Sequence, residues 1–211
     1  MPRQVDHVRR RREIVEATLN VLSEAGTRGL SFRAVANEMG GSTTLITHYF
    51  PTQRELLDEV TTQVLAGWDD DVKKLDAQEQ TPAVRLQALL RWLVPLTEQG
   101  LKEERNRIHL LAGQLLGEEN RAILQATETK IRELIRNHVT GLVPPDEVER
   151  TVELLRITTN GLVLSVLEHP DLWPPERQIA ILDWLTDSLG IAPAGAHKPR
   201  GHVKAGAVSR S

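Results

Sequence analysis

A pair of adjoining glycines, Gly40 and Gly41, separates two helical patterns that are each only about two turns long. The pattern before the pair is opened by Ser31, and its apolar side chains share one helical face: Val35, Ala36 and Met39. After the pair, Ser42 is a suitable N-cap for a helix over 43–49, which Pro51 ends. This spacing restricts the segment to a compact unit of short helices.

An amphipathic helix precedes this unit, beginning at Arg9 and ending at Gly26. Its apolar residues recur with helical spacing: Ile14, Ala17, Val21, Leu22 and Ala25. Three helices therefore fit into residues 9–50. Two short helices joined by a glycine turn are the unit that places a second helix in the major groove of DNA. We expect a helix-turn-helix head over residues 9–55.

The rest of the chain predicts an all-α fold, with longer helices and no convincing strand alternation. The expected helices cover 53–75, 82–99 with a kink at Pro95, 102–116, 119–139, 146–168 and 175–189. The breaks between them contain glycine or proline. The expected organisation is a flexible N-terminus (1–8), the DNA-binding head (9–55), a helical ligand-binding and dimerisation body (56–190) and a disordered tail (191–211).

The composition limits the partners and the compartment. The 211 residues include no cysteine, which excludes disulfides, thiolate zinc sites and cysteine nucleophiles. A net charge of −3 argues against coating nucleic acid through bulk positive charge, so any DNA binding must be local. No apolar run approaches the ~18–20 residues that span a bilayer, and no signal-peptide core follows the N-terminal arginines. We expect a cytoplasmic protein with no membrane partner.

The third short helix is too polar to be only core. Thr43, Thr44, Thr47 and His48 can face outward while Ile46 anchors the helix. Threonine hydroxyls and methyls suit phosphates, base edges and thymine methyls, and Tyr49 places a phenol at the helix end. Ser42 caps an N-terminus whose amides attract phosphate oxygens. The alternative is an ordinary polar surface helix.

The stretch Gly-Gly-Ser-Thr-Thr-Leu-Ile-Thr-His-Tyr-Phe-Pro at 40–51, followed by Glu-Leu-Leu at 55–57, resembles the DNA-binding signature of the TetR family of bacterial regulators. Its wording is similar to the BetI-like branch, which contains the choline-responsive repressors of betaine synthesis. The resemblance covers residues 9 to about 60 in detail and the remainder only by helix count and order. It implies DNA-facing positions at Arg33, Thr43, Thr44, Leu45, Thr47, His48 and Tyr49, with Ile46 and Phe50 locking the recognition helix.

Two positions depart from the family pattern. Gly41 stands where a valine is common, which would loosen the turn. Gln53 stands where a phosphate-binding lysine is common, and Arg54 is an imperfect substitute. The four arginines at 9–12 can grip phosphates beside the groove, or they can be part of a frayed, solvated N-terminus.

A ligand site is expected in the body, where the sequence identifies it poorly. Trp68 and Trp92 lie on the first two body helices, and the aspartates at 69–71 follow Trp68. Aromatic faces with nearby carboxylates suit an organic cation, and the BetI-like resemblance points to choline or a similar cation. Pockets and recognition helices evolve separately, so the inducer does not transfer. His109 and Gln114 can line a polar spot in the site; all four can equally be structural.

The last two helices predict a homodimer interface. On the helix over 146–168 one apolar stripe is flanked by a second apolar face, so the helix must be buried on two sides. The expected interface residues are Leu154, Ile157, Gly161, Ser165, Ile181, Trp184 and Leu185. Such an interface resembles the four-helix dimer contact of the TetR family. The alternative is a monomeric core helix.

An all-helical enzyme is the main rival class, and the sequence lacks the parts for one. Its seven histidines are scattered, and no Glu-x-x-His pair suits a di-iron bundle. Phosphate-binding glycine loops, nucleophile elbows and zinc-protease motifs are missing as well. We expect no catalytic residues, no metal and no cofactor. A scaffold that binds only proteins would leave the polar face of the third helix unexplained.

The expected protein is therefore a ligand-responsive transcription regulator that binds a near-palindromic double-stranded DNA operator as a homodimer. A small-molecule inducer in the body would favour a conformer with a different spacing between the two heads. The helix that starts near Gln53 would couple head to body. Repression relieved by ligand is what the resemblance implies, and activation is the alternative.

Overall fold

The computed structural model describes residues 2–79, 81–114 and 118–191. Its regular structure in those ranges is helical, apart from one β-bridge between Thr140 and Val143. In chain order the helices are α1 (Pro2–Gly29), α2 (Phe32–Glu38), α3 (Thr43–Tyr49), α4 (Gln53–Gln78), α5 (Pro82–Trp92), α6 (Glu98–Gln114), α7 (Glu118–Val139), α8 (Val148–Glu168) and α9 (Pro175–Ser188). Short 3-10 turns, Pro145–Glu147 and Pro170–Leu172, precede α8 and α9. The predicted all-α fold class is confirmed.

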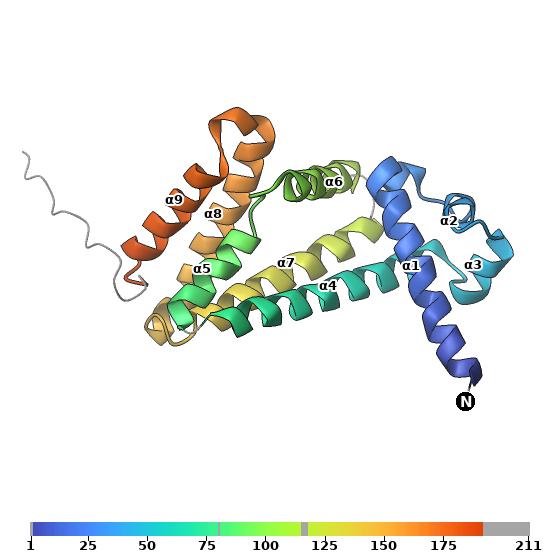
Figure 1. Ribbon diagram of the computed structural model, residues 1–211, viewed down its shortest axis with the longest axis horizontal. Coiled ribbons are helices and arrows are strands. Elements are labelled where there is room, and N and C mark those ends of the chain that lie inside the picture. Colours follow the sequence, from blue (N-terminus) through green and yellow to red (C-terminus); the bar gives the residue numbers. More distant parts are fainter. Residues whose placement is uncertain (1, 80, 115–117, 192–211) are drawn as a thin grey trace, which may run out of the picture.

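The helices bury two hydrophobic cores, one in the head and one in the body (Figure 1). The head core is formed by α1, α2 and α3 with the start of α4, and it includes Ile14, Val35, Ile46, Phe50 and Leu56. The body core draws on α5, α7, α8 and α9, and it includes Leu86, Leu90, Ile135, Leu155 and Leu182. Because α4 places Val60 in the first core and Val72 in the second, it is a continuous rod between them.

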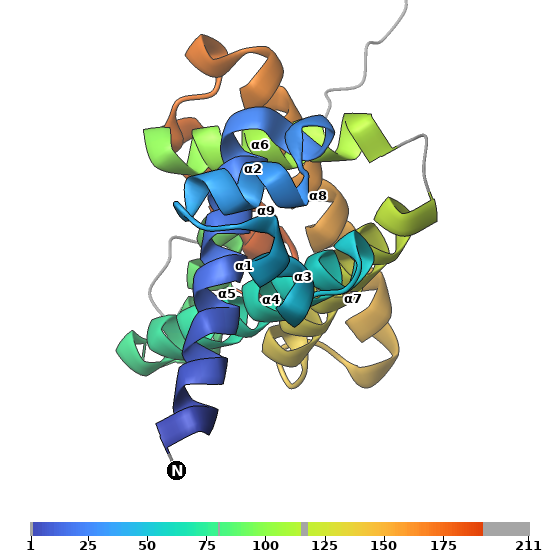
Figure 2. The same ribbon diagram turned by 90° about the vertical axis from the view of Figure 1, so that its right-hand side faces the viewer.

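The head rests on one end of the body. In both views α4 and α7 run alongside each other, and α6 reaches back to contact α1 (Figures 1 and 2). Ile123, near the start of α7, packs against the head core. The recognition unit is thereby joined to the body by contacts with three body helices, α4, α6 and α7.

Serine and threonine caps set where four helices begin. Ser31, Ser42, Thr52 and Thr81 each accept a hydrogen bond from the backbone amide three residues later. Such caps satisfy amides that have no partner within the helix, and each typically contributes about 1 kcal/mol. The head therefore folds around start signals that its sequence carries.

The first helix begins earlier than the sequence predicts. It starts at Pro2 rather than Arg9, and the ring of His7 packs on that of Tyr49 with centroids 4.5 Å apart. Residues 2–8, expected to be a flexible N-terminus, are helical in the structure. At the other end, Gly26 leaves the helical conformation with a φ of 64°, as its place in the pattern predicts.

The predicted helices over 82–99 and 102–116 are wrong in their boundaries. Helix α5 ends at Trp92, and α6 begins at Glu98. Proline has no amide donor and disfavours helical backbone in the residue before it, so Pro95 ends the helix instead of kinking it. Thr97 then accepts a hydrogen bond from the amide of Gly100 over 3.0 Å, which places Gly100 inside the first turn of α6.

The body extends one residue further than predicted. Ile191, assigned from sequence to the tail, is 3% exposed and packs in the body core. Its amide donates to the carbonyl of Thr186 after the left-handed Gly190. The remainder of the predicted tail, 192–211, lies outside the described residues.

Candidate DNA-contacting surface and the body behind it

The turn between α2 and α3 depends on Gly40. Its φ of 62° lies in the left-handed region that favours glycine. Gly41 does not share this requirement, and a Cβ on it would meet Cδ2 of Leu45 at 3.6 Å, an ordinary contact. There is room for a side chain at this position, so Gly41 would loosen the turn only through the greater conformational freedom of glycine.

Helix α3 presents a polar face to solvent and a purely apolar face to the core. Ile46 and Phe50 are 0% and 1% exposed. The residues on the exposed face are Thr43, Thr44, Thr47 and His48. The hydroxyl of Thr47 donates to the carbonyl of Thr44 over 3.2 Å, so its acceptor lone pairs still face outward. This face carries donors, acceptors and methyl groups of the kind that read base edges.

The other predicted DNA-facing residues have mixed environments. Arg33 on α2 is exposed, whereas Leu45 and Tyr49 are half-buried. The hydroxyl of Ser42 accepts from the amide of Leu45 over 3.3 Å, so its first role is to cap α3. The Tyr49 ring lies edge-on to that of His48, with centroids 5.2 Å apart.

Gln53 has a structural role that the sequence does not reveal. Its side-chain amide donates to the carbonyl of Leu30 over 3.2 Å, which ties the start of α4 to the loop after α1. Arg54 is exposed and lies 4.0 Å from Asp58. The position where the TetR-like pattern commonly has a lysine thus holds α4 against the loop after α1, and the neighbouring Arg54 is a cation exposed at the surface.

Two of the four N-terminal arginines share one carboxylate. Arg9 and Arg10 lie 3.0 Å and 2.6 Å from the oxygens of Glu13, one helical turn away. Arg12 is exposed and has no hydrogen bond or ion pair within the described part of the chain. The cluster belongs to a continuous helix, and Arg12 is its most available charge.

The structure brings together two of the predicted ligand residues, Trp68 and Trp92. Their ring centroids lie 5.8 Å apart at an interplanar angle of 84°, and both rings pack against the body core. Each of the neighbouring aspartates already forms an ion pair with a lysine. The pairs are Asp69 with Lys130 (2.8 Å), Asp70 with Lys73 (3.5 Å) and Asp71 with Lys74 (2.9 Å). The side chains of His109 and Gln114 lie outside the described residues.

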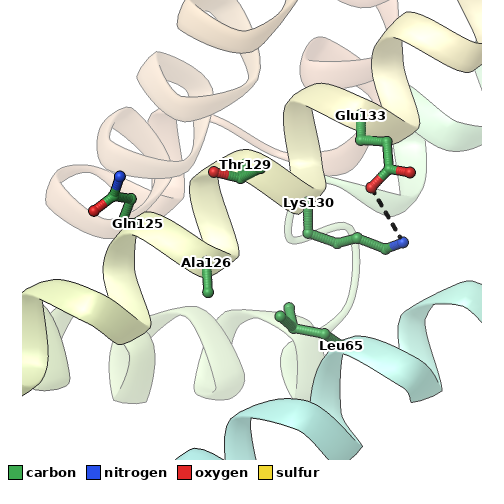
Figure 3. Close-up of a pocket in the computed structure, with 6 residues that line it drawn as sticks. All are labelled: Leu65, Gln125, Ala126, Thr129, Lys130 and Glu133. Carbon is green, nitrogen blue, oxygen red and sulfur yellow. Dashed lines mark hydrogen bonds and ion pairs between the residues drawn. The ribbon is translucent and has the colours of Figure 1, made fainter.

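An open pocket of about 450 Å³ lies between α4 and α7 (Figure 3). It is lined by Leu65, Gln125, Ala126, Thr129, Lys130 and Glu133. Lys130 pairs with Asp69 at 2.8 Å and with Glu133 at 3.5 Å. Neither Trp68 nor Trp92 is among these lining residues.

Helices α8 and α9 carry an uncovered apolar face. Ile157 and Trp184 are each 66% exposed, and Leu154, Leu164 and Ile181 are 36–42% exposed. Gly161 lies exposed on the same stripe of α8. The opposite side of α8 is fully used, since Val152, Leu155, Leu162 and Val166 are at most 5% exposed. Exposed apolar side chains that gather on one face in this way, rather than singly, mark an interaction site.

One residue of the predicted interface belongs elsewhere. Leu185 is 8% exposed and packs in the core of its own subunit. Helical geometry turns neighbouring residues by about 100°, so Leu185 points inward where Trp184 points outward. Ser165 is half-buried at the edge of the stripe.

No cluster of three or more histidine, cysteine, aspartate or glutamate side chains in the described residues could hold a metal ion. No described helix is long and apolar enough to cross a membrane.

Two family models match the chain. The model for bacterial regulatory proteins of the tetR family matches residues 14–60, which span α1 to the start of α4. The model for the C-terminal region of BetI-type transcriptional repressors matches residues 82–190, from α5 to the end of α9. Head and body are therefore assigned separately, and the second match covers more than half of the chain.

Curated relatives agree with this assignment. The HTH-type transcriptional regulator PksA of Bacillus subtilis is 37% identical over 103 residues, 49% of this chain and 50% of PksA. The regulator BetI of Rhizobium meliloti is 25% identical over 155 residues, 74% of this chain and 76% of that protein. The alignment with PksA thus spans only half of that relative.

Solved structures show the same fold. A transcriptional regulator from Rhodococcus is 25% identical, with a TM-score of 0.70 over 85% of this chain and 95% of that one. A putative regulator from Saccharomonospora viridis, solved in complex with choline, is 18% identical with a TM-score of 0.66 over 84% and 95%. These proteins are regulators, not enzymes, and the chain belongs to the TetR family of transcription regulators, with a helix-turn-helix DNA-binding head and a BetI-type body.

Proposed function

We propose that this regulator is a ligand-responsive repressor that binds a near-palindromic operator as a homodimer. The observation that carries the proposal is the pairing of two surfaces. Helix α3 exposes a polar face on a buried anchor, and α8 and α9 expose an apolar face that the subunit leaves uncovered. The first surface suits a half-site of DNA, and the second suits another copy of the chain.

The recognition face consists of Thr43, Thr44, Thr47 and His48, and Arg33 is exposed on the preceding helix, α2. Threonine contacts base edges, thymine methyls and phosphates, and arginine adds charge to the phosphate backbone. Ser42, Leu45 and Tyr49 support the face from the helix ends and its flank. Arg12 supplies a further phosphate contact from α1.

Dimerisation is part of the DNA-binding proposal. A chain with a net charge of −3 has little bulk attraction for DNA, and one short head reads only a half-site. Two heads on a rigid body bind with a much higher effective affinity when their spacing matches the half-sites. The interface consists of Leu154, Ile157, Gly161, Ser165, Ile181 and Trp184.

The inducer acts in the body, where Trp68 and Trp92 meet. An organic cation is our candidate ligand, since indole faces attract cations and the Saccharomonospora viridis relative was solved with choline. Helix α4, which shares both cores, carries the response to the head. A ligand that prefers a different tilt of α4 shifts the spacing of the two recognition helices.

The test uses the full chain and the DNA upstream of its own gene. We expect a salt-dependent gel shift that unlabelled operator competes and unrelated DNA does not. Titrating choline and related quaternary amines should quench tryptophan fluorescence and release the shift, and in-vitro transcription should rise on release. Transcription that requires the bound protein would instead indicate an activator, and absence of any shift would refute operator binding.

A further inference from the structure

Arg11 lies where three helices of the head meet. Its Nη1 donates to the backbone carbonyl of Tyr49 over 3.3 Å, and its Nη2 donates to Oε2 of Glu59 over 2.5 Å. Its Cζ lies 4.4 Å from the centroid of the Phe50 ring. One guanidinium on α1 therefore contacts the last residue of α3, the residue after it, and a carboxylate on α4.

Each contact uses a different property of the guanidinium. The last carbonyls of a helix lack partners within the helix, and Arg11 satisfies that of Tyr49. A cation is also favoured at the negative end of the helix dipole and over an aromatic face. Only arginine offers a planar fork that reaches a carbonyl and a carboxylate at once.

The charge of Arg11 is already neutralised inside the head. Side chains of Arg11 and Glu59 are 33% and 27% exposed, and Gln63 also donates to Glu59 over 2.9 Å. Hydrogen bonds from Gln63 and Arg11 lower the pKa of Glu59, so this carboxylate is ionised at neutral pH. Arg12, the next residue, has no such partner in the described ranges.

We infer that Arg11 is a positioning residue for operator recognition, which fixes the C-terminal end of α3 to α1 and α4 instead of contacting DNA. The inference rests on the proposed function. Because Glu59 lies on α4, the same contact ties the orientation of the recognition helix to the rod that enters the body. Arg11 is thereby assigned a role in positioning α3, whereas its neighbour Arg12 is assigned a role in contacting phosphate.

The two roles differ in their dependence on salt. Each phosphate contact contributes about one to the slope of log affinity against log salt, on operator and unrelated DNA alike, so a phosphate-contacting residue contributes about two in a homodimer. Removing a positioning residue lowers the affinity for the operator but leaves that slope and the affinity for unrelated DNA unchanged. A variant that merely destabilised the head would lower both apparent affinities together, and correcting for the active fraction by stoichiometric titration would restore both.

The experiment compares Arg11→Gln, Arg11→Lys, Glu59→Ala and the matched control Arg12→Gln in the full chain. We expect Arg11→Gln to lower operator affinity about tenfold with an unchanged slope, and Arg11→Lys to recover part of the loss. Glu59→Ala should also lower operator affinity. Arg12→Gln should weaken binding to both kinds of DNA and reduce the slope by about two, one for each subunit of the dimer.

Two results would overturn the inference. One is a slope reduced by about two in Arg11→Gln, one for each subunit, which would make Arg11 a phosphate contact. The other is tighter operator binding by Glu59→Ala, because release of Arg11 for DNA would explain it; this variant gives the answer even if Arg11→Gln fails to fold. Failure of the unaltered chain to bind any operator would refute the proposed function, whereas these results presuppose that it binds.

Discussion

The backbone amide of Gly41 donates to the carbonyl of Ala36 over 2.8 Å. The amide of Gly40 donates at the same turn to the carbonyl of Asn37 over 3.1 Å. This pair of bonds is the Schellman motif, which closes a helix through one left-handed residue. That residue is Gly40, so the two adjacent glycines differ in what they contribute to the head.

Alanine at the two positions should have opposite effects. Gly40→Ala places a side chain at a φ of 62° and should destabilise the protein by about 1 kcal/mol. Gly41→Ala meets only an ordinary contact with Leu45 and should stabilise by about 0.4–1 kcal/mol, because it restricts the unfolded chain. Urea unfolding followed by circular dichroism measures both. Equal destabilisation by the two variants would contradict the described turn.

Removing the Thr47 side chain should impair recognition without harming the fold. Its hydroxyl lies on the exposed face of α3, and its only described bond is to Thr44 within the helix. We expect Thr47→Ala to lower operator affinity about tenfold or more in a gel shift, at unchanged helicity and size. Thr62→Ala is the control, because Thr62 is exposed on α4 and makes the same kind of bond to Asp58. If both variants bind like the unaltered chain, the DNA assignment of Thr47 is wrong.

A charge at Gly161 should separate the subunits. Gly161 is exposed on the apolar stripe of α8, where its Cβ position is open in the monomer. Burying a carboxylate against a partner's apolar face costs several kcal/mol, so Gly161→Glu should elute at half the dimer mass. Leu19→Glu is the control, since it places the same charge on an exposed leucine of α1. A dimer that persists in Gly161→Glu would refute the interface.

The carboxylate of Glu128 should make the free energy of unfolding depend on pH in the acidic range. Burial raises its pKa, but hydrogen bonds from Arg156 and Arg132, at 2.9 Å and 2.7 Å, outweigh burial and hold the pKa below 4.5. A depressed folded-state pKa contributes stability above about pH 4.5, and this is lost as pH falls through the folded value. We expect Glu128→Gln to flatten the fall in the free energy of unfolding between neutral pH and acid. The free energy of unfolding is measured by urea titration at each pH, and an equally steep fall with pH in Glu128→Gln would count against this α7–α8 contact.

The local structure of the head follows from its amino-acid sequence alone. Ser42, Gly40 and Pro51 carry their start and stop signals within a few residues, so the position of α3 follows from nearest-neighbour chemistry. The same helical period places Ile46 inward and Thr47 outward. The resemblance of residues 40–51 to the TetR signature then indicated that this helix binds DNA.

Periodicity also showed that α8 is apolar on two sides, but it gave no means of telling them apart. Val152 and Ile157 look equivalent in sequence, and only tertiary packing, chiefly against α7, decides that the first is buried and the second is left open. Leu185 and Trp184 were both assigned to the interface, and tertiary packing took Leu185 into the subunit core.

Contacts between distant residues were decided by tertiary structure alone. Arg11 looks like any member of a basic run until α3 and α4 bring Tyr49 and Glu59 to it, across 38 and 48 residues of sequence. In the sequence Gln53 is notable only because it stands where a lysine is common, whereas in the fold its side-chain amide donates a hydrogen bond to the carbonyl of Leu30. Helical signals act over a few residues, whereas these partners meet only once separate helices have packed, and that packing sets which charges are left for DNA.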